Sequence, residues 1–148
     1  MRAVYNSTRR NGTDTDLYLI NPSDPKTNRL LLQLNGGGWG VADWSPDDSK
    51  LLLGEGVSAN ESYIWLVDVT SGEKSLLTSR DDVNKVNYGQ ARFSKDGRGV
   101  YLTTDKDSEF MRLAYMDLAT RQQTFLSNQI KWDVDSFALS PDGKTIAF

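Results

Sequence analysis

Between residues 139 and 148 the chain reads Leu139-Ser140-Pro141-Asp142-Gly143-Lys144-Thr145-Ile146-Ala147-Phe148. Proline presets the backbone φ of a tight turn, aspartate accepts hydrogen bonds from nearby backbone amides, and glycine takes a positive φ at no steric cost. Apolar residues lie on both sides of this Ser-Pro-Asp-Gly turn. The stretch therefore predicts a β-strand, a tight turn and a second β-strand.

The same pattern occurs three times along the chain. The two earlier copies are Trp44-Ser45-Pro46-Asp47-Asp48-Ser49-Lys50-Leu51-Leu52-Leu53 and Phe93-Ser94-Lys95-Asp96-Gly97-Arg98-Gly99-Val100-Tyr101-Leu102. A second apolar element, at residues 17–21, 64–68 and 113–117, keeps step with the first. Several short strands in a period of roughly 40–50 residues are typical of a β-propeller blade.

Each period accommodates four strands, which we label A to D from the inside of the propeller outward. The predicted strands are A at 41–45, 90–94 and 136–140, B at 2–6, 50–54, 99–103 and 144–148, C at the second element, and D at 30–34, 75–78 and 124–126. No segment has a sustained 3.6-residue apolar period, so little helix is expected. The predicted fold class is all-β, an open, partial β-propeller of four-stranded antiparallel blades with about three blade equivalents.

The blade assignment predicts one partial propeller domain over residues 1–148. Residues 1–34 supply strands B to D of a first blade, 35–80 and 81–128 each form a blade, and 129–148 supply strands A and B of a further blade. A closed propeller typically needs about four to eight blades. This chain is therefore not expected to close a propeller alone, and its open blade edges favour self-association.

The composition argues against several function classes. The 148 residues carry a formal net charge of −3 without a basic stripe, so nucleic-acid binding is not expected. Cysteine and histidine are both absent, which excludes disulfides, thiolate chemistry and a Ser-His-Asp triad within this chain. No apolar run approaches the ~20 residues that cross a bilayer, so no membrane contact is expected. Without a recognisable signal peptide the compartment stays unknown, with the cytoplasm slightly favoured.

Three short motifs approach the patterns of catalytic or binding sites. Residues 56–60 lack the second glycine of a Gly-x-Ser-x-Gly nucleophile elbow. The glycine-rich residues 35–40 have no predicted helix after them, so we interpret them as a flexible linker between blades, with Trp39 packed or at the channel mouth. Residues 105–109 contain three acidic side chains but not the EF-hand pattern, and are expected to form a solvated loop. No catalytic, cofactor-binding or metal-binding residue is predicted, and no cofactor.

The loops between the repeats resemble the propeller of the prolyl oligopeptidase (S9) family of serine peptidases, in particular its acylaminoacyl-peptidase and dipeptidyl-peptidase branch. The resemblance rests on residues 4–19, 60–68, 101–110 and 132–135. The Ser-Pro-Asp-Gly repeat alone is also similar to TolB-type propellers and other WD40-like repeats. In the peptidase family a propeller precedes an α/β-hydrolase domain, covers its active site and restricts entry to short peptides.

The resemblance implies a non-catalytic propeller segment that gates and orients peptide substrates for an α/β-hydrolase domain missing from this sequence. The parent protein would be a hydrolase acting in proteolysis, with the hydrolase domain and peptides as partners. The candidates for substrate contact are Glu109, Arg112 and Trp39, and Asp133 and Asp135 are further candidates. The alternative is a TolB-like propeller module for protein-protein interaction.

Overall fold

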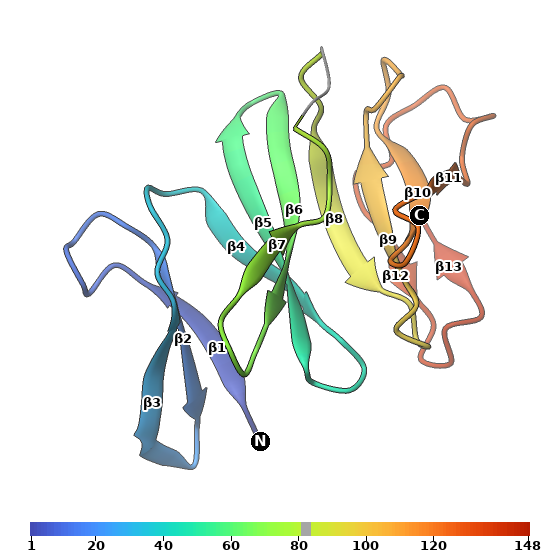
Figure 1. The fold of residues 1–148 in the computed structure, drawn as a ribbon. Coiled ribbons are helices and arrows are strands. Elements are labelled where there is room, and N and C mark those ends of the chain that lie inside the picture. Colours follow the sequence, from blue (N-terminus) through green and yellow to red (C-terminus); the bar gives the residue numbers. More distant parts are fainter. Residues whose placement is uncertain (81–83) are drawn as a thin grey trace.

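The computed structural model describes residues 1–80 and 84–148, and all of its regular elements are β-strands (Figure 1). The strands are β1 (Ala3–Ser7), β2 (Asp16–Asn21), β3 (Asp24–Leu32), β4 (Trp39–Trp44), β5 (Lys50–Ser58), β6 (Glu61–Asp68), β7 (Lys74–Leu76), β8 (Tyr88–Phe93), β9 (Gly99–Thr104), β10 (Arg112–Asp117), β11 (Gln123–Phe125), β12 (Ala138–Leu139) and β13 (Ile146–Ala147). The predicted fold class is confirmed.

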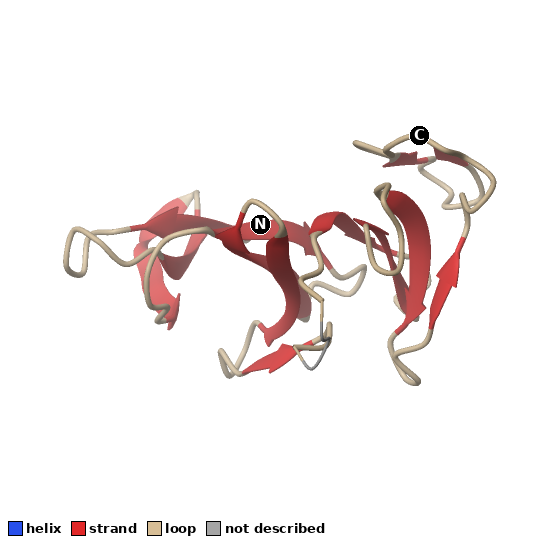
Figure 2. Cartoon of the chain, turned by 90° about the horizontal axis from the view of Figure 1, so that it is seen from above, coloured by secondary structure: helices blue, strands red, loops and turns tan. Residues whose placement is uncertain are grey.

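The strands form four separate antiparallel sheets. Sheet 1 has the order β1-β2-β3, sheet 2 β4-β5-β6-β7, sheet 3 β8-β9-β10-β11, and sheet 4 β12-β13. Every strand pairs with its neighbour in sequence, so each sheet is a meander. In Figure 1 sheet 1 lies at the left, sheet 2 in the middle and sheets 3 and 4 at the right, and Figure 2 shows the same strands from above. The predicted division between residues 80 and 81 borders residues 81–83, which lie outside the described residues.

Several strands differ clearly in length from the sequence prediction. Strand β5 continues to Ser58, because the tight turn at residues 59–60 lets β5 and β6 pair up to Ser58 and Glu61. Strands β12 and β13 are only two residues long and share two residue pairs. Sheet 4 is thus the smallest sheet of the described chain.

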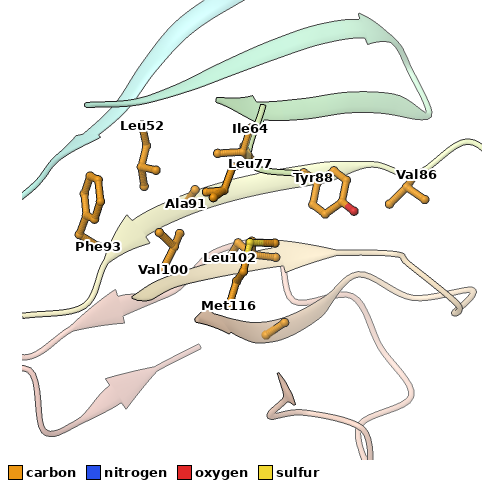
Figure 3. Packing of buried hydrophobic residues seen from close by; sticks show 11 residues of the cluster. Leu52, Ile64, Leu77, Val86, Tyr88, Ala91, Phe93, Val100, Leu102 and Met116 are labelled. Carbon is orange, nitrogen blue, oxygen red and sulfur yellow. The ribbon is translucent and has the colours of Figure 1, made fainter. Parts of the chain in front are cut away.

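The hydrophobic core lies between neighbouring sheets. Successive side chains of a strand point to opposite faces, so Leu51 and Leu53 pack toward sheet 1 whereas Leu52 packs toward sheet 3. Figure 3 shows the cluster between sheets 2 and 3, which consists of Leu52, Ile64, Leu77, Val86, Tyr88, Ala91, Phe93, Val100, Leu102, Ala114 and Met116. The cluster between sheets 3 and 4 is much smaller, with Leu113, Val134 and Phe137 as its buried members. A sheet therefore needs a neighbour on each side to bury both of its faces.

The turns between strands A and B share one hydrogen-bond pattern. Ser45 Oγ donates to Asp47 Oδ1 at 2.6 Å and accepts the Lys50 amide at 2.8 Å. The equivalent serine-aspartate pairs are Ser94–Asp96 and Ser140–Asp142, each at 2.6 Å. In these three turns the residue with a positive φ angle is Asp48 (58°), Gly97 (70°) and Gly143 (71°), respectively. The turn chemistry expected from the sequence is thus present in all three turns, with Asp48 in place of a glycine in the first.

We expect Asp47→Asn to remove a pH-dependent part of the stability. The Ser45 hydroxyl, together with the Ser49 hydroxyl and amide, lowers the pKa of Asp47 from 3.8 to about 2. Because the folded pKa lies below the unfolded one, this carboxylate stabilises the fold above pH ~4, and the contribution is lost as the pH falls toward 2. The thermal midpoint should therefore fall more steeply between pH 5 and pH 2 in the wild type than in the variant. Asparagine tolerates a positive φ, so the control variant Asp48→Asn should keep the wild-type slope. Equal slopes in all three proteins would contradict the prediction.

Candidate functional site

The loops that join strands B and C lie at the same end of the molecule as the starts of the A strands, and we call this end the loop end. The register shows this in sheet 2, where Trp39 at the start of β4 pairs with Glu55 near the end of β5, and Glu55 pairs with Tyr63 near the start of β6. The loops between β5 and β6 and between β9 and β10 lie at the top of Figure 1. The three candidates for substrate contact, Trp39, Glu109 and Arg112, all lie at the loop end.

Trp39 packs in an aromatic-cation cluster on the face of sheet 2 that lies toward sheet 1. The ring centroids of Trp39 and Trp65 are 6.0 Å apart, and Lys74 Nζ lies 4.4 Å and 4.1 Å from them. Trp39 Nε1 donates to the Asn35 carbonyl at 3.0 Å. Burial lowers the pKa of the Lys74 ammonium. The chain's own lysine thus contacts both indole rings, which supports the interpretation of Trp39 as a packed residue.

Glu55 and Arg80 extend this cluster, and the sequence analysis missed them. Glu55 Oε2 accepts hydrogen bonds from Trp65 Nε1 at 2.8 Å and from Arg80. The Arg80 guanidinium lies 4.3 Å from the centroid of the Tyr63 ring. The predicted strands 50–54 and 64–68 left Glu55 and Tyr63 in a loop. In the structure these two residues pair on β5 and β6, on the same face as Trp65, where side chains on adjacent strands contact each other.

Arg112 and Glu109 lie in and beside the loop of residues 105–111 and differ in their surroundings. Arg112 Nη1 donates to Asn128 Oδ1 at 2.8 Å, Nη2 donates to the Lys106 carbonyl, and the guanidinium lies 3.8 Å from the Phe125 ring centroid. Glu109 is exposed. A peptide carboxylate would therefore have to replace existing partners of Arg112, whereas Glu109 faces solvent.

The remaining candidates are not gathered into one site. Asp133 Oδ1 accepts the Met111 amide at 2.8 Å, which ties the segment before sheet 4 to sheet 3. Asp135 is exposed. Trp39 has its ring contacts within sheet 2 and Arg112 has its contacts within and beside sheet 3. The structure thus places the candidates at one end of the molecule, but on different sheets.

The glycine-rich connection between sheets 1 and 2 is held by several hydrogen bonds. Asp14 Oδ1 accepts the Gly36 amide at 2.7 Å, and the Gly36 carbonyl accepts the Thr15 amide at 3.1 Å. The Gly38 carbonyl accepts the Gly56 amide at 2.8 Å. The connection is therefore anchored at both ends, where the sequence analysis had expected a flexible linker.

A groove of about 450 Å³ runs along the innermost strands β4, β8 and β12, near the turns between strands A and B. Its polar side chains join one sheet to the next. Asp43 Oδ2 accepts the Phe93 amide at 2.9 Å. Gln90 donates to the Phe137 carbonyl at 3.0 Å and accepts the Phe137 amide at 2.8 Å. None of the three substrate-contact candidates lines this groove.

Within residues 1–80 and 84–148 no group of three or more acidic, histidine or cysteine side chains is arranged to hold a metal ion. In the same part of the chain no helix has the length and apolar character to cross a membrane.

The separate four-stranded sheets and the cores between them define an open, partial β-propeller, and solved structures share this fold. TolB from Acinetobacter baumannii is similar with a TM-score of 0.73 at 22% identity, over 99% of this chain and 34% of that one. A mutant of puromycin hydrolase is similar with a TM-score of 0.61 at 19% identity, over 76% of this chain and 18% of that one.

A curated relative supports the resemblance to peptidases. Dipeptidyl-peptidase 5 of Porphyromonas gingivalis is 26% identical over 123 residues, which cover 74% of this chain. The match spans 17% of that protein, so this chain corresponds to a minor part of its length. No model of a known protein family matches the chain. The predicted resemblance to a peptidase propeller is confirmed, while activity, substrates and partners belong to the proposal that follows.

Proposed function

We propose that residues 1–148 form a non-catalytic part of the propeller of a serine peptidase similar to the prolyl oligopeptidase family. In this proposal the chain is one partial propeller domain, divided at residues 34/35, 80/81 and 128/129. Its role is to exclude large substrates and to orient short peptides for an α/β-hydrolase domain. That domain and the peptides are its partners, and self-association through open sheet edges is a further expected contact.

The observation that carries the proposal is the match to Dipeptidyl-peptidase 5 over 123 residues. The sequence of this chain contains no Gly-x-Ser-x-Gly nucleophile elbow and no histidine for a general base. The chemistry of bond cleavage would therefore belong to the hydrolase domain. The loop end would contribute the peptide contacts, with Glu109 facing the peptide amino group beside Arg112, and with Trp39 at the same end but on another sheet.

The alternative function is a TolB-like module that binds protein partners. The similarity to TolB over 99% of this chain favours it, since this match is longer than the match to the puromycin hydrolase mutant. Structural likeness at 22% identity supports the fold, which hosts unrelated functions. The two functions differ in whether short peptides bind at the loop end.

Peptide titration separates these functions. We expect tetrapeptides with a free amino terminus to shift the backbone amide resonances of residues 105–111, the loop that carries Glu109, in NMR spectra of the purified chain. A charge-assisted hydrogen bond contributes about 1.5–3 kcal/mol, so Glu109→Gln should weaken binding about tenfold or more. N-terminal acetylation of the peptide should have the same effect.

The matched control is Glu73→Gln, an exposed glutamate in the turn between β6 and β7, away from the loop end. It should bind peptides as the wild type does. Absence of binding at millimolar peptide would favour the interaction module. Peptide hydrolysis that persists through purification would contradict the non-catalytic role.

A further inference from the structure

The dipeptide Asn-Gly occurs at two places in the chain, Asn11-Gly12 and Asn35-Gly36. All four residues are exposed to solvent. An asparagine side chain closes most readily onto the backbone nitrogen of a following glycine, because glycine has no Cβ atom to obstruct the ring. Sequence and exposure therefore open both places to deamidation.

Deamidation needs water and no other reactant. The glycine backbone nitrogen attacks Cγ of the asparagine side chain, so that a new C–N bond forms and the bond from Cγ to the side-chain nitrogen breaks. The proton of the glycine amide leaves with that nitrogen as ammonia. Water then opens the succinimide ring at one of its two carbonyls and gives aspartate or isoaspartate. The rate depends on how easily the glycine amide loses its proton and reaches Cγ.

The carboxylate of Asp14 contacts both Asn-Gly pairs. Its Oδ1 accepts the Gly36 amide at 2.7 Å, and its Oδ2 accepts Asn11 Nδ2 at 2.6 Å. The Gly36 bond, followed by the Asn11 bond, lowers the pKa of Asp14, so the carboxylate is ionised at neutral pH. An anion therefore lies directly at the nitrogen that would attack Asn35.

This anion opposes the reaction at Asn35-Gly36. The hydrogen bond stabilises the protonated form of the Gly36 amide, and the negative charge disfavours the amide anion that attacks. The other side of the same peptide unit is also held, because the Asn35 carbonyl accepts Trp39 Nε1 at 3.0 Å. Arg10 Nη2 binds the other carboxylate oxygen of Asp14 at 3.0 Å and leaves Oδ1 to Gly36.

The pair Asn11-Gly12 depends less on the carboxylate. The Gly12 amide donates to the Thr8 carbonyl at 2.7 Å. Asn11 Oδ1 accepts the backbone amides of Thr13 at 3.1 Å and of Asp14 at 2.9 Å. These bonds use backbone groups, so a substitution of the Asp14 side chain does not remove their donors or acceptors.

We propose that Asn35 is a deamidation site and that the Asp14 carboxylate keeps it unreacted by holding the Gly36 amide. Isoaspartate at position 35 would lengthen the main chain between sheets 1 and 2 by one methylene group. It would also turn the Asn35 carbonyl, the acceptor of Trp39 Nε1, into a free carboxylate. The modification thus changes the chemistry of the connection at the loop end. The proposal does not depend on any role of the chain in a peptidase.

Peptide mapping by mass spectrometry during incubation at neutral pH tests the proposal. Asp14→Ala should deamidate at Asn35 at least about tenfold faster than the wild type, because it removes a charge-assisted hydrogen bond from the attacking nitrogen. Asp14→Asn keeps an acceptor oxygen without the charge, so its rate should lie between the two. The rate at Asn11 should rise less than the rate at Asn35 in both variants.

Three controls accompany these variants. Asn35→Ser combined with Asp14→Ala should abolish the signal at position 35. Val100→Ala shortens a fully buried side chain of sheet 3 and destabilises the fold without touching the connection. It should keep the wild-type rate at Asn35. The wild type unfolded in urea gives the rate without protection, and circular dichroism of each incubated sample shows that the variants remain folded.

The outcomes separate local protection from the stability of the whole fold. Equal rates at Asn35 in the wild type and both Asp14 variants would overturn the role of the carboxylate. An equal acceleration in Val100→Ala would assign the protection to global unfolding and would overturn it as well. So would a folded wild type that reacts as fast as the unfolded chain. Peptide binding at the loop end is measured separately and is unaffected by these results.

Discussion

Gly72→Ala should lower the free energy of unfolding by about 3 kcal/mol, as the sum of backbone strain and overpacking. Gly72 has a φ of 75° in the turn between β6 and β7, a conformation that L-residues rarely adopt. A Cβ atom there would lie 2.3 Å from the carbonyl oxygen of Leu31 in β3. The substitution would therefore separate sheets 1 and 2, and urea denaturation measures the loss.

Gly12→Ala is the matched control for this clash. Gly12 has a φ of 77°, but a Cβ atom there meets nothing within 4 Å. It should therefore cost only the strain of the backbone, about 1 kcal/mol. Equal losses for the two variants would show that close contact between sheets 1 and 2 contributes nothing at Gly72.

Asp16→Ala should also destabilise the fold by about 3 kcal/mol, because it removes a buried carboxylate together with its hydrogen bonds to the Leu34 amide and the Arg10 guanidinium. Asp16 is fully buried. Its Oδ2 accepts Arg10 Nε at 2.7 Å, and its Oδ1 accepts Arg10 Nη2 at 3.1 Å and the Leu34 amide at 3.0 Å. These bonds join the loop before β2 to the segment after β3, and urea denaturation at pH 7 measures their loss.

The same carboxylate predicts a pH dependence. The hydrogen bond from Arg10, followed by that from the Leu34 amide, lowers the pKa of Asp16. Its contribution is therefore present above the unfolded pKa of about 4 and is lost as the pH falls below it. The difference between wild type and Asp16→Ala should shrink on acidification. The control is Asp135→Ala, which removes an exposed aspartate. It should change the free energy of unfolding by less than about 0.5 kcal/mol both at pH 7 and at acidic pH. A similarly small effect of Asp16→Ala would remove the proposed role of the buried carboxylate.

The candidate site was only partly predictable. The sequence indicated Glu109 and Arg112 through resemblance to a family and Trp39 through the glycine-rich stretch of residues 35–40, and the structure places all three at one end of the molecule. Lys74 at the rings of Trp39 and Trp65 could not be read from local pattern, since it comes from an outer strand of the sheet. The hydrogen bond between Arg112 and Asn128 could not be predicted from local pattern either, because strand pairing and a loop bring these two distant residues together.

The sequence by itself determined the succession of short strands and the chemistry of the turns, because the bonds between Ser45, Asp47 and Lys50 link residues within one short segment. Only the tertiary structure decided which apolar faces are covered. Leu77 and Leu126 occupy the same repeat position, yet one is buried and the other exposed. The physical reason is that burial in this fold depends on the presence of the next sheet, and contacts between sheets join residues that are tens of positions apart.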